Sequence, residues 1–160
     1  MRLLPTANSA SGGTKQKLVP FFLIAFVLAF LYLRFTTFRP HLKTMRVGTT
    51  TIAVDIADTV GKQRQGLSWR PSMPEDQGMY FLLGTPATHG FWMKDMHFPL
   101  DIIWIRNGVI VDISENVPYP LEGQTPASVQ PKEPADAVLE VNAGFTQRHG
   151  IKIGDEVSLE

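Results

Sequence analysis

The stretch GFWMKDMHFPLDIIWIRNGVIVDISEN, residues 90–116, carries the strongest structural signals in the chain. Residues 102–105 and 109–113 are two runs rich in β-branched side chains, joined by Arg106-Asn107-Gly108. Asn-Gly readily adopts the positive φ angles of a tight turn, so this stretch predicts a β-hairpin. Residues 100–105 are apolar on both faces apart from Asp101, which indicates a central strand covered on each side.

Short strands are expected on both sides of this stretch. Residues 91–94 predict a strand with Phe91 and Met93 on one face, and Pro99 marks the corner before the next strand. Further runs predict strands at residues 49–57, 78–83, 137–142 and 155–159, and short helices at about residues 59–67 and 143–149. About six short strands and two short helices, without β-α-β alternation, predict a mainly β (α+β) fold, a compact barrel-like domain.

The N-terminal part of the chain has a different organisation. Residues 1–17 are rich in small and polar residues and predict a disordered tail. Residues 18–33 are 16 uncharged, almost wholly apolar residues. As a helix they cover about 24 Å, which flanking basic side chains can extend towards a bilayer core of about 30 Å. We therefore expect a transmembrane anchor at residues 18–35, a spacer at residues 36–47 and one globular domain at residues 48–160.

Two features bear on where the domain lies. A cleaved signal peptide is the alternative to an anchor, but no small-x-small motif follows the apolar run. Basic residues lie on both sides of the run: Arg2, Lys15 and Lys17 before it, and Arg34, Arg39, Lys43 and Arg46 after it. By the positive-inside rule, this count leans weakly towards a cytoplasmic domain.

Charge and cysteine content exclude several functions. All 15 acidic residues but only nine of the 15 basic residues follow Met45, which gives this part a net charge of −6. Nucleic-acid binding needs a basic surface, so we expect no nucleic-acid partner. The chain has no cysteine, which excludes disulfides, thiolate catalysis and thiolate zinc sites.

Four polar residues interrupt apolar strands and are the main candidates for a site: Lys94, Asp101, Glu140 and Asn142. Burying an unpaired charge is costly, so such groups must find partners or line a wet cleft. One interpretation is a structural ion pair between Lys94 and Asp101 or Glu140. The other is a shared ligand-binding pocket, completed by Trp92 and Met93, in which Lys94 holds an anionic ligand and a carboxylate acts as base.

A metal site is a weaker hypothesis. His89, Met93, Met96 and His97 form a soft-ligand set of the kind that suits copper(I). On a strand, however, Met93 and Met96 point to opposite faces, so the ligands converge only if the chain turns at Asp95. Core packing explains Met93 more simply, and we expect no metal and no cofactor.

Aromatic residues offer a further surface. Trp69 and Trp92 are candidates for an exposed groove that binds sugar or peptide, whereas Phe91 and Trp104 are better explained by core packing. One edge of such a groove would come from Pro118, Tyr119 and Pro120.

The chain resembles the domain of unknown function 192 family in five blocks that occur in order and spacing. These blocks are QGL (65–67), MPEDQGM (73–79), FWMK (91–94), PLDII (99–103), and LEVNAGF (139–145) followed by GIKIGD (150–155). The resemblance covers roughly residues 47–160 and implies a small, mainly β domain, frequently exported behind a signal or anchor, with no established activity. It favours an extracytoplasmic domain, against the weak charge count, and it gives no support to chemistry at Met96 or His97.

Three functions follow as hypotheses. We expect a membrane-anchored, extracytoplasmic (periplasmic) module that contacts the bilayer through residues 18–35 and binds a small or extended envelope ligand. A hydrolase or transferase with Asp101 or Glu140 as general base is the first alternative, although no nucleophile elbow, phosphate loop or paired-histidine motif supports it. The second is a stabilising partner of another membrane protein, contacted through the proline-rich segment 117–134.

Overall fold

The computed structural model of the protein describes residues 22–30 and 42–160. The chain divides into two compact units, residues 1–40 and residues 41–160. Residues 22–30, inside the predicted anchor, form a helix, and no helix in the described part of the chain is long and apolar enough to cross a membrane. The predicted tail, both ends of the predicted anchor and residues 36–41 of the predicted spacer lie outside the described residues.

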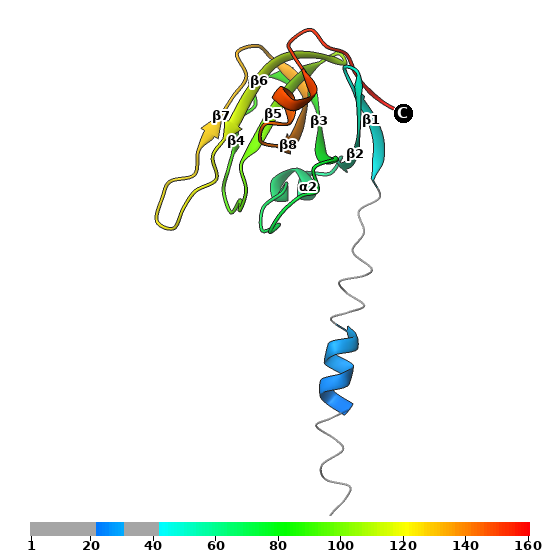
Figure 1. The fold of residues 1–160 in the computed structure, drawn as a ribbon. Coiled ribbons are helices and arrows are strands. Elements are labelled where there is room, and N and C mark those ends of the chain that lie inside the picture. Colours follow the sequence, from blue (N-terminus) through cyan, green and yellow to red (C-terminus); the bar gives the residue numbers. More distant parts are fainter. Residues whose placement is uncertain (1–21, 31–41) are drawn as a thin grey trace, which may run out of the picture. The chain divides into compact units, whose positions relative to one another are not determined.

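A seven-stranded sheet forms the body of the second unit (Figure 1). Its order is β6 (Val109–Val117), β5 (Leu100–Arg106), β8 (Ala135–Asn142), β3 (Gln77–Ala87), β2 (Thr50–Ala57), β1 (Lys43–Val47) and β9 (Val157–Leu159). Neighbours pair antiparallel, except that β2 and β3 are parallel. The sheet curves into a half-barrel, and backbone hydrogen bonds between residues 154–157 and 108–110 join its two edges at one end. The predicted mainly β, barrel-like fold is confirmed.

The predicted hairpin is also present. β5 and β6 pair antiparallel, and the turn between them places Asn107 and Gly108 at φ angles of 52° and 75°. Positive φ at both central residues gives a turn whose twist matches the strands. Every residue of β5 before Arg106 is buried, so β5 is the covered strand that the sequence predicts.

Each face of the sheet carries its own hydrophobic core. The inner core, inside the curve, includes Ile103, Leu139, Val141 and Phe145 of helix α3 (Phe145–His149). The outer core includes Met79, Phe81, Ile102, Trp104 and Val138 from the sheet, covered by Leu67, Met73, Met93 and Met96 from loops. Because successive residues of a strand point to opposite faces, each strand contributes to both cores.

The number of strands and the start of the folded part differ from the prediction. Nine strands are described in residues 42–160 rather than about six, and β1 and β7 (Ser128–Val129) are the two that the sequence did not predict; like β4 (Phe91–Trp92) and β9, they are short. β1 lies inside the predicted spacer, so the folded part begins at residue 43 and not at residue 48. The sequence did not predict β1 because only Met45 and Val47 are apolar and fully buried, while Lys43, Thr44 and Arg46 are exposed.

A small second sheet also differs from the prediction. β4 pairs with β7, so the strand predicted at residues 91–94 lies outside the main sheet and ends at Trp92. Just beyond, Asp95 has a φ of 58°, which turns the chain away. β7 belongs to the predicted surface segment 117–134, whose far end is held where the Lys132 N–H donates to Asp112 at 2.9 Å. The helix expected at residues 59–67 is the shorter α2 (Val60–Gln65), capped by Thr59.

Candidate functional site

A cavity of about 640 Å³, here called the first cavity, lies on the outer face of the sheet. One side is formed by α2 and residues 65–68, and the other by residues 89–92 and Met96. Apolar and aromatic side chains supply much of its lining: Leu67, Phe81, Leu83, Phe91, Trp92 and Met96. Polar lining comes from Gln63, Arg64, Ser68, His89 and Glu140, among others. Volume and lining are typical of a small-molecule site.

Phe91 fixes one wall of the first cavity. Its ring meets the rings of Phe81 and Trp104 edge-on, at centroid distances of 5.1 and 5.4 Å and interplanar angles of 84° and 88°. This T-shaped geometry is the one that aromatic quadrupoles favour. Next to it, the Met93 N–H donates to the carbonyl oxygen of Ala127 at 2.8 Å. The wall is therefore held by packing and by backbone hydrogen bonds.

Glu140 of β8 lies at the floor of the first cavity. It stands opposite Met79 of β3 and Ile102 of β5, on the outer face of the sheet. The residue is 7% exposed, and its Oε2 is buried with no hydrogen-bond partner in the described part of the chain. Burial raises the pKa of Glu140 to about 8, while Arg70, itself paired with Asp55 at 2.8 Å, acts in the opposite direction. At neutral pH this carboxyl group is therefore mostly protonated and can donate a hydrogen bond.

Asp101 lies on the opposite face of the sheet. It stands opposite Val141 and points into the inner core, where it is fully buried. Its Oδ1 accepts a hydrogen bond from the Asn116 N–H at 2.8 Å, and its Oδ2 accepts from the N–H and the hydroxyl of Thr146 at 3.0 and 2.7 Å. These bonds join β5 to the end of β6 and to α3. Asp101 therefore stabilises the fold and does not reach the first cavity.

Lys94 and Asn142 are also engaged elsewhere. Lys94 is exposed, with its Nζ 5.2 Å from the centroid of the Trp92 ring, and within residues 42–160 it forms no ion pair with Asp101 or Glu140. The predicted ion pair is therefore wrong. The Asn142 amide donates to the carbonyl oxygens of Met73 and Pro74 at 3.0 and 3.1 Å, which holds that loop against β8.

The pocket predicted to contain all four polar groups is likewise not formed. Two features of the sheet explain this. Asp101 and Glu140 point to opposite faces, because successive residues of a strand alternate between faces, and residues 91–94 lie outside the main sheet. Of the six predicted site residues, Glu140 and Trp92 come together in the first cavity. Met93 is 1% exposed and packs in the outer core.

Comparison with known proteins places this geometry in a family. The sequence pattern of DUF192, a family described as "Uncharacterized ACR", matches residues 43–159. The chain belongs to the DUF192 family. A comparison with curated proteins finds no match.

Two solved structures are similar to this DUF192 domain. A protein from Sinorhizobium meliloti 1021, provisionally described as a transcription regulator, is 32% identical with a TM-score of 0.68, over 75% of this chain and 95% of that one. A protein of unknown function from Novosphingobium aromaticivorans DSM 12444 is 32% identical with a TM-score of 0.63, over 73% of this chain and 84% of that one. Both likenesses agree with the family assignment and assign no ligand to the site.

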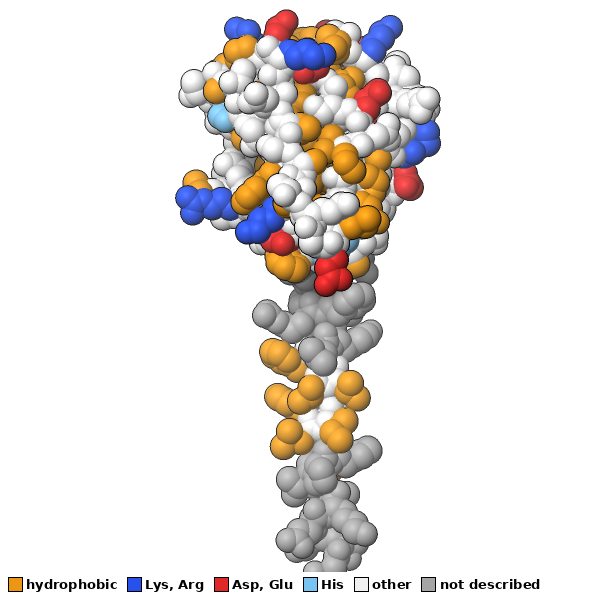
Figure 2. Space-filling model, turned by 90° about the vertical axis from the view of Figure 1, so that its left-hand side faces the viewer, with side chains coloured by type: hydrophobic (Ala, Val, Ile, Leu, Met, Phe, Trp, Pro, Cys, Tyr) orange, Lys and Arg blue, Asp and Glu red, His pale blue; other side chains and the backbone are white. Residues whose placement is uncertain are grey.

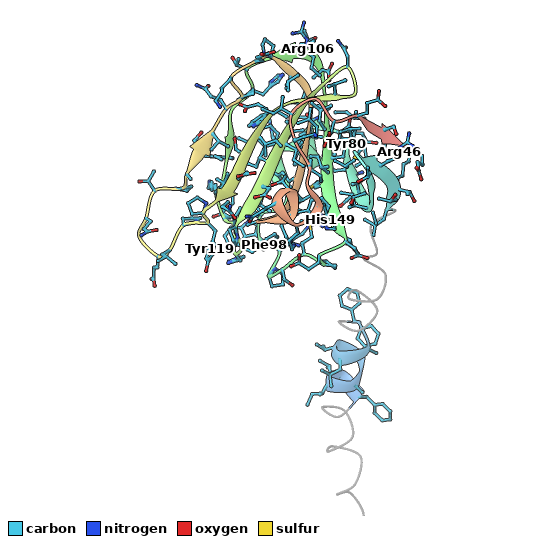
Figure 3. The ribbon with its side chains drawn as sticks, turned by 45° about the horizontal axis from the view of Figure 1, so that its top comes forward. Arg46, Tyr80, Phe98, Arg106, Tyr119 and His149 are labelled. Atoms are coloured by element: carbon cyan, nitrogen blue, oxygen red, sulfur yellow. The ribbon has the colours of Figure 1, made fainter. Side chains whose placement is uncertain are left out.

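The DUF192 domain has a second cavity, of about 570 Å³, which shares Trp92 and Met96 with the first. Trp69 and Trp92 line it and are 67% and 63% exposed, and residues 120–126 supply the other side. Figure 2 shows hydrophobic side chains exposed among charged ones on the face with β4 and β7. Figure 3 shows Phe98 and Tyr119 at one end of the domain and Arg106 of the hairpin at the opposite end.

The two histidines considered as metal ligands in the sequence line different cavities. His89 lines the first cavity, where its Nε2 is 3.2 Å from the carbonyl oxygen of Thr85, whereas His97 lines the second. The His97 ring lies 6.3 Å from the Trp69 ring, between centroids. In the described ranges, no group of three or more His, Asp or Glu residues is placed to hold a metal ion.

Sequence reasoning missed much of the lining of the first cavity. Phe81 and Leu83 follow Met79 at intervals of two along β3, a pattern that identifies one face of a strand but not what covers it. Gln63 and Arg64 enter the lining because α2 packs over this face, and their side chains carry no signal of that placement. A helix of six residues contains too little periodicity to predict its packing partner.

Replacing Asp101 by alanine is expected to destabilise the DUF192 domain by about 2–4 kcal/mol, because the buried donors of Asn116 and Thr146 lose their acceptor. Exposed Lys94 provides a matched control, and Lys94→Ala is expected to change stability by less than about 0.5 kcal/mol. Urea unfolding followed by circular dichroism measures both variants. An Asp101→Ala protein as stable as the wild type would contradict the structural role.

The raised pKa of Glu140 predicts how stability depends on pH. Its folded-state pKa of about 8 exceeds its ordinary value of 4.5, so the unfolded chain releases this proton at lower pH. Relative to Glu140→Gln, stability is expected to be highest below pH 4.5, to fall by a few kcal/mol between about pH 4.5 and 8, and then to level off. Urea titrations of both proteins across this range give the difference, and a difference that rises with pH would count against the buried acid.

Proposed function

We propose that the domain binds a small organic molecule in the first cavity and that Glu140 recognises it. The observation that carries this proposal is the buried Oε2 of Glu140, which has no partner in the described residues. An unsatisfied buried polar group costs about 1–3 kcal/mol, and a ligand that pairs with it removes this cost. A largely apolar cavity with few polar groups that fix orientation is the usual form of a ligand site.

The lining favours an uncharged ligand with an apolar body and one hydrogen-bond acceptor. Protonated Glu140 offers an O–H donor, which suits a carbonyl oxygen, an ether oxygen or a heteroaromatic nitrogen. Phe81, Phe91 and Leu67 provide contact for a flat apolar body. Arg64 also lines the cavity, and its positive charge disfavours a cationic ligand.

Proton transfer by Glu140 is the second candidate function. A general acid works best with a pKa near the working pH, and the pKa of Glu140 is raised to about 8. The hydroxyl of Ser68, which also lines the cavity, donates to the carbonyl oxygen of Lys94 at 2.9 Å, so it is not activated as a nucleophile. Asp101 points to the other face. Turnover of a bound ligand would support the hydrolase or transferase hypothesis over binding alone.

A contact between residues 117–134 and another protein stays a prediction. Part of this segment is already occupied, because β7 pairs with β4 and residues 120–126 line the second cavity. Tyr119 and Leu121 are 38% and 61% exposed and are the side chains that such a partner would meet first. The orphan oxygen of Glu140 favours the ligand-binding proposal over this one.

Fragment screening by thermal shift on the full-length protein is expected to find ligands of this class. Glu140→Leu keeps an apolar side chain but removes the donor, so it should raise stability at neutral pH while weakening binding about tenfold or more. Glu140→Gln keeps an N–H donor and is the matched control, with affinity within a few-fold of wild type. Calorimetric titration measures the affinities; equal binding by wild type and Glu140→Leu would end the proposal.

We also propose that residues 18–35 anchor the domain in a membrane, with the domain on the extracytoplasmic side. The uncharged run of residues 18–33 supports the anchor. Within the described helix, Leu23, Ile24, Phe26 and Leu28 are 60–73% exposed. A helix that is apolar all round is suited to lipid. The proposed side follows the family resemblance of the sequence.

Membrane extraction tests this anchor. The full-length protein is expected to stay with membranes after an alkaline carbonate wash, whereas an Ile24→Asp, Phe26→Asp double variant is expected to enter the soluble fraction, because each charge costs about 2.5–3.5 kcal/mol in the bilayer. Val60→Asp, at an exposed position of the domain, is the control that should leave extraction unchanged. Release of the wild-type protein by the wash would contradict the anchor. Protease added outside the cytoplasm should cut the domain.

A further inference from the structure

Trp69 is held at the surface by an unusual backbone conformation. Its φ is 66°, in the left-handed region that bulky residues rarely adopt. The Trp69 N–H donates to the carbonyl oxygen of Asp95 at 2.8 Å, and the neighbouring Ser68 hydroxyl donates to the carbonyl oxygen of Lys94 at 2.9 Å. Asp95 is itself at a φ of 58°. Two loops are thus locked together, and Trp69 projects from their junction with 67% of its surface exposed.

A tryptophan at position 69 is unfavourable for the stability of the folded domain. A left-handed backbone is strained for any residue with a large side chain, whereas glycine or asparagine adopts it more easily. The exposed indole regains little of this free energy by burial. Strain of this kind is typical of sites where a side chain must be held in one orientation for a ligand. Trp69 therefore points to recognition.

The second cavity provides the place for such a ligand. Trp69 lines it together with Trp92, and Pro120 and Leu121 lie among the residues on its other side. Trp92 is 63% exposed and Leu121 is 61% exposed, while Lys94 lies over the Trp92 ring. The second cavity therefore presents indole and aliphatic surface to solvent. Of its two tryptophans, Trp92 has a cation over its ring, and Trp69 has none among the described residues.

We propose that the second cavity binds a neutral oligosaccharide that stacks on the indole of Trp69. A sugar ring has an apolar C–H face, which packs on an aromatic plane, and an edge of hydroxyl groups that need donors and acceptors. The lining supplies both: Lys94 donates, Asp95 and Glu122 accept, and Gln124 has an amide. The mixture of charges disfavours a polyanion, and the polar edge disfavours a purely apolar partner.

This inference goes beyond the proposed function of the first cavity and does not depend on it. Trp92 and Met96 line both cavities, so substitutions there would not separate the two sites. Trp69 lines only the second cavity and Glu140 only the first. Variants at these two positions can therefore test the sites one at a time.

The test compares full-length wild type with Trp69→Asn and Trp69→Phe in a detergent without a sugar headgroup. The probes are short neutral oligosaccharides of glucose, of xylose and of N-acetylglucosamine, with binding measured by calorimetry and by ligand-observed NMR. Wild type is expected to bind at least one probe, and Trp69→Asn to weaken that binding about tenfold or more. Trp69→Phe keeps a ring and should lose less, and Glu140→Leu should leave this affinity unchanged.

Thermal unfolding supplies a readout that a structural role would not produce. Asparagine tolerates the left-handed backbone, so Trp69→Asn is expected to raise Tm by a few degrees while binding falls. A lower Tm for this variant would show that Trp69 serves the fold and would overturn the inference. Unchanged oligosaccharide affinity in Trp69→Asn would overturn it as well. So would binding of proline-rich peptides but of no oligosaccharide at about 10 mM. None of these outcomes affects the test of Glu140.

Discussion

The pairing of β8 with β3 on one side and β5 on the other is the constraint on which both cores and the first cavity depend. A shift of one residue would move every side chain of β8 to the wrong face of the sheet. The fit is close, because a Cβ on Gly78 of β3 would lie 2.8 Å from the carbonyl oxygen of Glu140. With Leu139 and Val141 fixed in the inner core, the side chain of Glu140 must enter the outer face.

Asp101 and Glu140 show how one sheet assigns opposite roles to two buried carboxyl groups. Asp101 accepts hydrogen bonds from Asn116 and Thr146, so its burial is compensated and it ties three elements together. Glu140 has Met79 and Ile102 as its cross-strand neighbours, and neither side chain can donate to it. The domain therefore retains a polar group whose burial its own described residues do not compensate. Departures from local consistency of this kind are expected at functional sites.

The sequence predicted the features that depend on residues close together in the chain, and not those that depend on contacts between distant segments. The hairpin and the mainly β class depend on local features, above all Asn107-Gly108 and the β-branched runs on either side. The candidate site depends on the register between strands that are distant in the sequence. Asp101 stands opposite Val141, so its side chain lies on the other face of the sheet from that of Glu140. No local sequence pattern predicts this register. Pairing of Phe91–Trp92 with Ser128–Val129 is equally non-local. Glu140 was therefore identifiable as an anomaly in an apolar strand, but its surroundings were not.

Four non-glycine residues in the described part of the domain have positive φ: Trp69, Asp95, Asn107 and Asn116. Asparagine and aspartate tolerate this conformation, so three of the four need no special explanation. Trp69 is the exception, and it lies on a surface loop rather than in the sheet. Strained residues persist when the surrounding structure determines them, and two packed cores on a curved sheet provide that support. The stability of the sheet is thus what allows an unfavourable tryptophan to be displayed beside the cavities.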